Sequence, residues 1–194
     1  MEDLKLRVND YCGGTIDIAK LFDQVSRVLV EILARQAGIP EKVLSAYIRF
    51  QESLVIYNTI AGGLAVKYKK RCGIPQGGPL SMMLIALIMR PWVVMMQVKH
   101  SIRPSVLVDD IMLLANGTEM LSNLVGAMNA THAYLIDMGA KLAPKKSYNF
   151  ASTVAAMDFL GKVEWQHLDG DKVQVSTAFR YLGAQISATK ALAE

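Results

Sequence analysis

The stretch that decides the fold is Ser105-Val106-Leu107-Val108-Asp109-Asp110-Ile111-Met112-Leu113-Leu114-Ala115, in which two adjacent carboxylates interrupt an apolar run. Aspartate is depleted in β-strands and is almost never fully buried without a partner, so this pair needs an explanation. The simplest geometry is a β-hairpin with Asp109 and Asp110 at its tip. Adjacent carboxylates repel each other, and a divalent cation is the usual way to keep both ionised. The pair is therefore a candidate metal site, with a solvated Asp-Asp turn as the alternative.

The composition predicts one densely packed domain. The chain has 194 residues, of which 52% are hydrophobic and 11 are methionine, and its mean hydropathy is +0.26. This length is sufficient to bury a core. A net charge of +4 and a pI near 9.0 permit a nucleic-acid partner. Two cysteines, Cys12 and Cys72, are too few for a disulfide framework, so we expect a reducing compartment, cytoplasmic or nuclear, and no secretion.

The sequence predicts neither a signal peptide nor a membrane partner. Residues 1–7 are charged and no apolar core follows them. The longest apolar run, residues 80–89, is interrupted by Arg90-Pro91 before it resumes at residues 92–96. Because a spanning helix needs roughly 20 apolar residues, we expect a buried helix over residues 82–89. No internal repeat or low-complexity linker divides the chain, so residues 1–194 are expected to form one domain.

The remaining patterns predict an α+β fold, in which a small antiparallel sheet is backed by helices. A short strand over residues 15–19 carries Asp17, and Asp23 is a plausible cap for the helix that follows. Apolar spacing predicts helices over residues 24–37, 41–50 and 122–138. Turn residues predict hairpins over residues 54–68 and 163–175, and residues 179–186 are expected to form one further strand.

Two loops carry residues that suit nucleic acid or nucleotides. Lys69, Lys70 and Arg71 form a basic cluster beside Tyr68; a solvated strand end is the alternative. The next segment, residues 72–81, is rich in glycine and proline. Its glycines allow close approach of a ligand to the backbone around Gln76, although an ordinary strand-to-helix connection has the same composition. The three histidines share no metal-ligand spacing, so no site is assigned to them.

Asp17, Asp109 and Asp110, together with the Gln76 loop, are the parts that two-metal phosphoryl or nucleotidyl transfer requires. Carboxylates can hold two divalent ions, and all-oxygen ligation suits Mg²⁺. Sequence spacing does not show that Asp17 reaches the acidic hairpin. From the residues alone, the prediction is a metal-dependent phosphoryl-transfer site.

Five segments resemble, in the same order along the chain, the palm motifs of reverse transcriptases. They are Asp17-Ile18-Ala19-Lys20-Leu21-Phe22-Asp23, Gly73-Ile74-Pro75-Gln76-Gly77-Gly78-Pro79-Leu80-Ser81, Leu107-Val108-Asp109-Asp110, Gly139-Ala140-Lys141-Leu142-Ala143-Pro144-Lys145-Lys146-Ser147 and Phe179-Arg180-Tyr181-Leu182-Gly183. The resemblance covers residues 15–187. The glycine loop and the Tyr-Leu-Gly segment look most like non-LTR retrotransposon and group II intron-type enzymes.

The resemblance implies RNA-templated DNA synthesis from a DNA primer and deoxynucleoside triphosphates, with two Mg²⁺ ions or Mn²⁺ in their place. It implies that Asp17, Asp109 and Asp110 are catalytic metal ligands, with the Ile18 carbonyl as a further ligand, and that Lys146 donates a proton to the leaving pyrophosphate. It also implies that Phe22 lies beneath the sugar and favours deoxynucleotides, and that Gln76 and Gly77 lie along the nascent base pair. The primer end is expected at Tyr181, Leu182 and Gly183, and other contacts with nucleic acid at Lys69, Lys70 and Arg71.

The chain departs from the family pattern in four places. Leu107 stands where an aromatic is common, and Ala143 where asparagine is frequent. Only 16 residues precede Asp17, and the chain ends soon after the Tyr-Leu-Gly segment. We therefore expect a palm with partial fingers and no thumb, a fragment of a longer polyprotein that supplies the missing segments. Three alternatives stay open: an inactive remnant with at most weak nucleic-acid binding, a palm-fold RNA-dependent RNA polymerase, and a metal-dependent nuclease.

Overall fold

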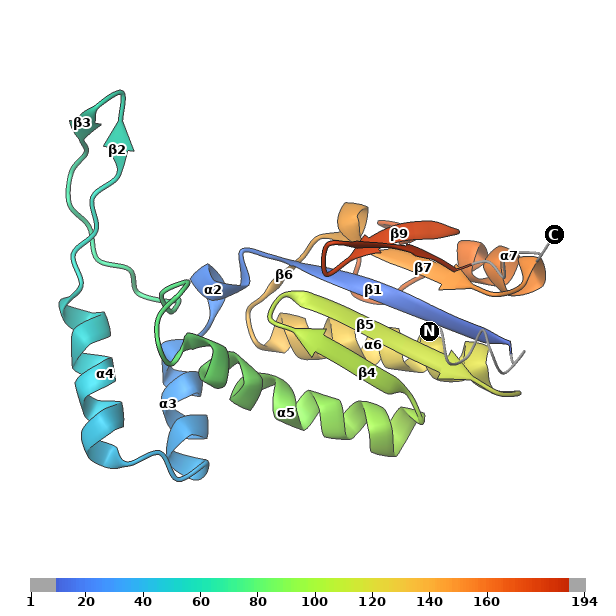
Figure 1. The fold of residues 1–194 in the computed structure, drawn as a ribbon, viewed down its shortest axis with the longest axis horizontal. Helices are drawn as coiled ribbons and strands as arrows, with labels where there is room; N and C mark the ends of the chain where they lie inside the picture. The colour runs from blue at the N-terminus through green and yellow to red at the C-terminus, as the bar shows by residue number, and fades with distance from the viewer. Residues whose placement is uncertain (1–9, 189–194) are drawn as a thin grey trace. The chain divides into compact units, whose positions relative to one another are not determined.

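The computed structural model describes residues 10–188 and confirms the predicted α+β class (Figure 1). In chain order the elements are β1 (Tyr11–Ala19), α2 (Leu21–Gln24), α3 (Arg27–Gln36), α4 (Glu41–Ser53), β2 (Thr59–Ile60), β3 (Gly63–Leu64), α5 (Ser81–His100), β4 (Arg103–Leu107), β5 (Asp110–Asn116), α6 (Met120–Asp137), β6 (Lys141–Leu142), a 3₁₀ turn (Pro144–Lys146), β7 (Tyr148–Ala151), α7 (Val154–Lys162), β8 (Gln174–Val175), β9 (Ala178–Tyr181) and β10 (Ala184–Ser187).

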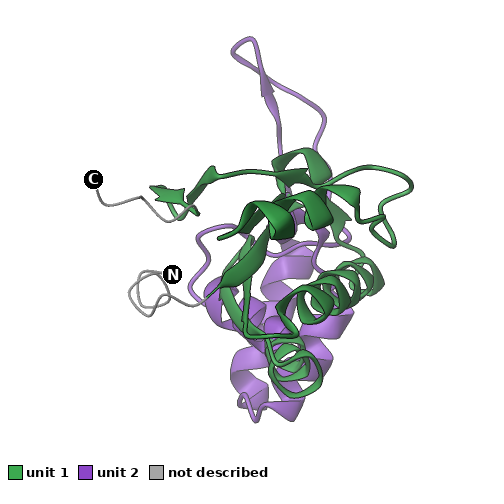
Figure 2. Cartoon of the chain, turned by 90° about the vertical axis from the view of Figure 1, so that its right-hand side faces the viewer, with its two compact units in different colours: residues 1–19, 90–194 green, residues 20–89 purple. Residues whose placement is uncertain are grey.

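The chain forms two compact units, distinguished by colour in Figure 2. The first, which we call the sheet unit, contains residues 1–19 and 90–194, and the second, the helical unit, contains residues 20–89. The chain passes from the sheet unit to the helical unit after Ala19, and returns within α5, after Met89.

The sheet unit is built around β1, the central strand. The sheet has the order β4-β5-β1-β7-β8, and β6 pairs with the far end of β1. All of these pairings are antiparallel except β7 with β8. The strand begins at Tyr11, four residues earlier than predicted. Gly13 and Gly14 are the reason for the difference, because glycine has a low strand propensity. A Cβ atom at Gly14 would lie 2.7 Å from the sulfur of Met128, so this glycine lets α6 pack closely on the sheet.

The acidic hairpin and the helix after it confirm the sequence prediction. Strands β4 and β5 pair from Arg103↔Leu114 to Leu107↔Asp110. Helix α6 packs on β1 and β5, burying the side chains of Leu124, Ala127, Met128, Thr131, His132 and Leu135. It ends before Gly139, whose φ of +80° suits glycine.

The C-terminal segment differs from the prediction in two ways. Residues 179–186 form the hairpin β9–β10 instead of one strand, because Leu182 and Gly183 both adopt positive φ and reverse the chain. The expected hairpin over residues 163–175 is absent from the described structure. Here Trp165 and Leu168 are buried, and β8 pairs in parallel with β7. The predicted turn does form, because the amide of Asp171 donates to the carbonyl of Leu168 at 2.8 Å, but the residues on its two sides do not pair with each other.

In the helical unit, α3 begins later than predicted. The hydroxyl of Ser26 caps it by accepting a hydrogen bond from the amide of Leu29 at 3.4 Å, so Asp23 is not its cap. Helix α4 extends to Ser53. The predicted hairpin over residues 54–68 is confirmed by the β2–β3 pairing and by a bridge between Ile56 and Tyr68.

Helix α5 continues through Pro91 and is longer than the predicted helix. Its buried side chains lie on both sides of the proline: Leu84, Ile85, Ile88, Met89, Trp92 and Met96. Met82 and Met83 are exposed, so the predicted burial of residues 82–89 holds only in part. Within the described residues α5 is the one helix long and apolar enough to cross a membrane, a test that buried core helices also pass.

Candidate active site

The register of the central sheet brings the predicted carboxylates together. Asp17, near the end of β1, stands directly opposite Asp110, the first residue of β5. Asp109 lies in the turn before β5, beside Val108, whose φ is +60°. The hairpin tip is therefore Val108-Asp109, one residue earlier than predicted, and Asp110 belongs to the strand. Residues that are far apart in the sequence thus meet at one end of the sheet.

The three carboxylates influence one another electrostatically. Burial raises the pKa of Asp17 above its ordinary value; Lys146 lowers this pKa and Asp109 raises it. The pKa of Asp110 is also raised, first by burial and then by the charges of Asp109 and Asp17. The site therefore holds an excess of negative charge that a cation would relieve.

Lys146 is the cation that the structure places at this site. Its Nζ lies 3.8 Å from Oδ2 of Asp17. The 3₁₀ turn that carries Lys146 is tied to β1 by two hydrogen bonds. The amide of Asp17 donates to the hydroxyl of Ser147 at 3.2 Å, and the amide of Ala143 donates to the carbonyl of Asp17 at 3.0 Å. These bonds hold the turn, while the side chain of Lys146 stays 74% exposed.

The donor set fits a divalent cation by its chemistry. Carboxylate oxygens are the hard ligands that Mg²⁺ prefers. Across residues 10–188, however, no group of three or more His, Cys, Asp or Glu side chains is arranged to hold a metal ion. The residues suit the ion by type and charge, and the metal site itself stays a prediction. Ile18, the proposed source of a carbonyl ligand, lies in β1 opposite Leu142.

The β9–β10 hairpin is packed against the strands of this site. The Tyr181 hydroxyl donates to the hydroxyl of Ser105 on β4 at 3.2 Å. Burial raises the pKa of Tyr181; the bond to Ser105 lowers this pKa and the charge of Asp110 raises it. Phe179 stacks on Phe150 with ring centroids 4.6 Å apart. The structure thus places the predicted primer-end segment beside the acidic hairpin through Tyr181.

The residues expected to contact the incoming nucleotide lie in the helical unit. Phe22 is half-buried in α2, whereas Gln76 and Gly77 are exposed in the loop before α5. The two segments are joined by a hydrogen bond of 2.8 Å from the amide of Ile74 to the carbonyl of Phe22. Within this unit, Phe22 and the Gln76 loop therefore belong to one local structure.

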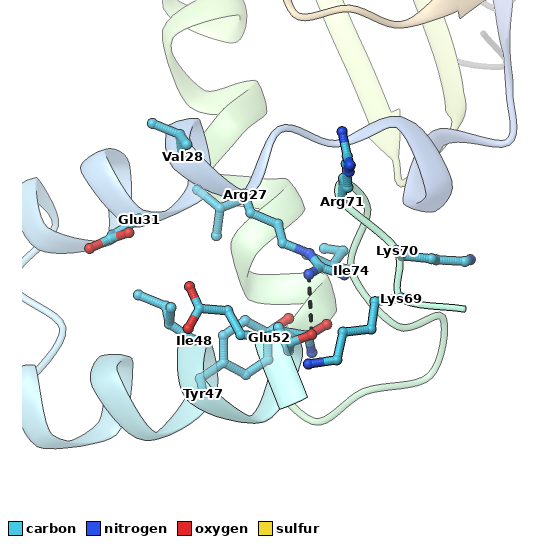
Figure 3. A pocket seen from close by; sticks show the side chains of 12 residues that line it. Arg27, Val28, Glu31, Tyr47, Ile48, Glu52, Lys69, Lys70, Arg71 and Ile74 are labelled. Carbon is cyan, nitrogen blue, oxygen red and sulfur yellow. Dashed lines mark hydrogen bonds between the residues drawn. The ribbon is translucent and has the colours of Figure 1, made fainter. Parts of the chain in front are cut away.

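The basic cluster lies in the same unit, and its three members have different surroundings. Lys70 forms an ion pair with Asp23, and Lys69 and Arg71 are exposed. All three border a cavity of about 620 Å³, whose other lining residues include Arg27, Tyr47 and Gln51. The side chains of Lys70 and Arg71 point away from Arg27 (Figure 3). Lys69 and Arg71 are therefore the exposed members of the cluster, and their role on nucleic acid stays a prediction.

Sequence reasoning missed three residues that hold these segments by hydrogen bonds: Ser105 and Ser147 in the sheet unit and Arg27 in the helical unit. Their partners are distant in the chain, at Tyr181, Asp17 and Gly73 respectively. A serine or arginine with a long-range partner has no local sequence signature, so no pattern identified them.

Comparison with known proteins then establishes the family. The family model described as "Reverse transcriptase (RNA-dependent DNA polymerase)" matches residues 2–186. The chain belongs to the reverse transcriptase family. No curated protein matches this reverse transcriptase chain. The likeness to non-LTR and group II intron-type enzymes stays a prediction.

Three solved telomerase structures share the fold of this reverse transcriptase chain. Apo telomerase from Candida tropicalis, truncated from its C-terminal domain, has a TM-score of 0.63 at 14% identity, covering 97% of this chain and 36% of that one. Telomerase from Candida tropicalis with a TWJ fragment of telomeric RNA gives 0.64 at 11%, covering 97% and 31%. The corresponding complex from Candida albicans gives 0.62 at 14%, covering 97% and 32%. The chain thus spans about a third of these telomerases, and at such identities the likeness shows the fold alone.

Proposed function

We propose that this chain is the palm, with part of the fingers, of an enzyme that synthesises DNA on an RNA template from a DNA primer. The observation that carries the proposal is the register that sets Asp17 opposite Asp110, with Asp109 in the adjoining turn. The family match supports it. We further propose that residues 1–194 form one domain of a longer, retrotransposon-derived polyprotein; the glycine loop and the Tyr-Leu-Gly segment favour this origin.

In this proposal Asp17, Asp109 and Asp110 hold two Mg²⁺ ions, or Mn²⁺, and the Ile18 carbonyl is a further ligand. Bound ions of this kind lower the pKa of the primer 3′-hydroxyl and stabilise charge at the transferring phosphorus. Lys146, exposed and 3.8 Å from Asp17, donates a proton to the leaving pyrophosphate. The raised pKa values of Asp17 and Asp110 are consistent with a site that is completed by positive charge.

In this proposal, residues of the helical unit and of the β9–β10 hairpin contact the substrates. Phe22 supports the deoxyribose and disfavours a 2′-hydroxyl, and Gln76 and Gly77 line the nascent base pair. The primer end rests on the turn of the β9–β10 hairpin at Tyr181, Leu182 and Gly183. Lys69, Lys70 and Arg71 contact the nucleic-acid backbone, where cations supply sequence-independent affinity.

Primer extension on an RNA template tests this function. We expect the chain to extend a DNA primer with deoxynucleotides in the presence of Mg²⁺ or Mn²⁺. Asp109→Ala should abolish extension, because it removes one carboxylate from the turn. Asp158→Ala is the matched control, because Asp158 is an exposed aspartate on α7, away from the carboxylate cluster in sequence and element.

The outcomes separate the alternatives. Equal extension by the native chain and Asp109→Ala would refute the catalytic proposal, and absence of extension from both would favour the inactive remnant. A preference for ribonucleotides would indicate an RNA-dependent RNA polymerase. Metal-dependent degradation of the template without extension would indicate a nuclease.

A further inference from the structure

Two segments of the helical unit that carry the proposed nucleotide contacts are bound to each other through their main chains. The amide of Ile74 donates to the carbonyl of Phe22, and the amide of Gly73 donates to the carbonyl of Val25, each at 2.8 Å. The first segment carries Phe22, and the second leads directly into Gln76. Any displacement of the loop relative to α2 must break these bonds.

Gly73 is what allows this close contact. A Cβ atom at this position would lie 2.8 Å from the carbonyl oxygen of Phe22 and 2.9 Å from that of Asp23. Its φ of +85° is also a conformation that side-chain-bearing residues rarely adopt. The loop therefore lies directly on the backbone of residues 22–23, with no side chain between them.

Arg27 holds this contact from the side. Its Nε donates to the carbonyl of Gly73 at 2.8 Å, and its Nη1 donates to the carbonyl of Gln51 at 3.2 Å. Figure 3 shows the second bond and the guanidinium between the loop and α4. Gln51 lies in the last turn of α4, where carbonyls have no partner within the helix. One planar guanidinium thus connects the start of α3, the end of α4 and the loop.

Arg27 stands at a position in its helix that does not favour a positively charged residue. It is the first residue of α3, where the helix dipole disfavours a positive charge. It also borders the cavity of about 620 Å³, which Ile74 of the loop lines as well. The hydrogen bond from Arg27 to the Gly73 carbonyl therefore restrains the loop beside this cavity.

We propose that Arg27 is a positioning residue for the nucleotide site: it fixes the Gly73 carbonyl, and through it keeps the Gln76 loop in register with Phe22. The inference rests on the proposed function, because it gives Phe22 and Gln76 their roles. Loss of the guanidinium removes the hydrogen bond to the Gly73 carbonyl and leaves the two main-chain bonds to hold the loop, which weakens nucleotide binding and relaxes the fit around the sugar.

Single-nucleotide incorporation with Arg27→Gln, Arg27→Lys and the native chain tests the effect on substrate. We expect KM for the deoxynucleotide to rise about tenfold in Arg27→Gln, because a charged donor to a partly buried carbonyl is lost. We expect kcat to change by less than about twofold and discrimination against ribonucleotides to fall. Arg27→Lys should restore binding only in part, because an ammonium lacks the planar fork. Arg35→Gln is the matched control, an exposed arginine of α3 paired with Glu31 and Glu41.

Hydrogen exchange decides the positioning role independently of activity. In Arg27→Gln the amides of Gly73 and Ile74 should exchange faster than in the native chain, and in Arg35→Gln they should not. Unchanged exchange at these two amides would overturn the inference, as would native KM and sugar discrimination in an active Arg27→Gln protein. If the native chain extends no primer, the proposed function fails, whereas the exchange result still shows whether Arg27 holds the loop.

Discussion

Stability of the fold should depend on pH through His132, a histidine on the buried face of α6. The residue is 1% exposed. Its Nδ1 lies 3.3 Å from the carbonyl of Gln166, and its ring meets Trp165 edge-on with centroids 6.3 Å apart. Burial is the main reason that its pKa is lowered from 6.5 to about 4. The folded protein therefore keeps this ring neutral.

The direction in which the free energy of unfolding changes with pH depends on whether the folded or the unfolded chain protonates His132 at the higher pH. As pH falls below 6.5, the unfolded chain protonates His132 while the folded chain does not, so the free energy of unfolding decreases. The loss is complete once pH falls below about 4. A pKa difference of this size corresponds to roughly 3 kcal/mol. Asp17 and Asp110 have raised pKa values and act in the opposite direction, stabilising the fold as pH falls, so a variant is needed to isolate the histidine.

Urea unfolding of the native chain and His132→Phe at pH 7 and pH 4 measures this contribution. Phenylalanine keeps a ring against Trp165 but cannot take up a proton. Between the two pH values, the native chain should lose roughly 3 kcal/mol more than His132→Phe. His167→Asn should behave as the native chain does, because His167 is exposed and only a minor cause of the shift. The same pH dependence in the native chain and His132→Phe would refute the reasoning.

Three further predictions concern packing and reactivity. A thiol reagent should modify Cys72 in the native protein, whereas Cys12, buried and with a pKa raised to about 12, should react only after unfolding; two fast-reacting thiols would contradict this. Tyr181→Phe should cost about 1 kcal/mol of unfolding free energy, and a double-mutant cycle with Ser105→Ala should show coupling, since their hydroxyls are 3.2 Å apart; strict additivity would argue against the bond. Gly14→Ala should destabilise the fold by roughly 1–3 kcal/mol, because the new methyl would lie 2.7 Å from a methionine sulfur of α6; an unchanged urea midpoint would show that the core yields freely.

Local chemistry accounts for the predictions that the structure confirms. The acidic hairpin follows from β-forming residues on both sides of two aspartates, and the stop of α6 follows from Gly139 at positive φ. The hairpin over residues 54–68 follows from its glycine turn. In each case the deciding residues are within a few positions of one another.

The predictions that were wrong involve competition with distant contacts. Within residues 163–175 the predicted turn forms, but the hairpin does not, because Trp165 and Leu168 are buried and β8 pairs with β7. Pro91 predicted an interruption, yet α5 continues because apolar side chains are buried before and after it. The early start of β1 was hidden by Gly13, a residue that weakens strand propensity but here makes room for Phe150.

By itself the sequence determined the order of the motifs that places the chain in its family, and it predicted which residues carry the chemistry: the acidic pair, the glycine loop and Lys146. Only the tertiary structure decided that Asp17 stands opposite Asp110, that Ser147 fixes the turn of Lys146, and that Arg27 holds Gly73. The reason is physical. A motif records the local requirement for a residue type, whereas register and long-range hydrogen bonds are set by how whole strands and helices bury their surfaces against one another.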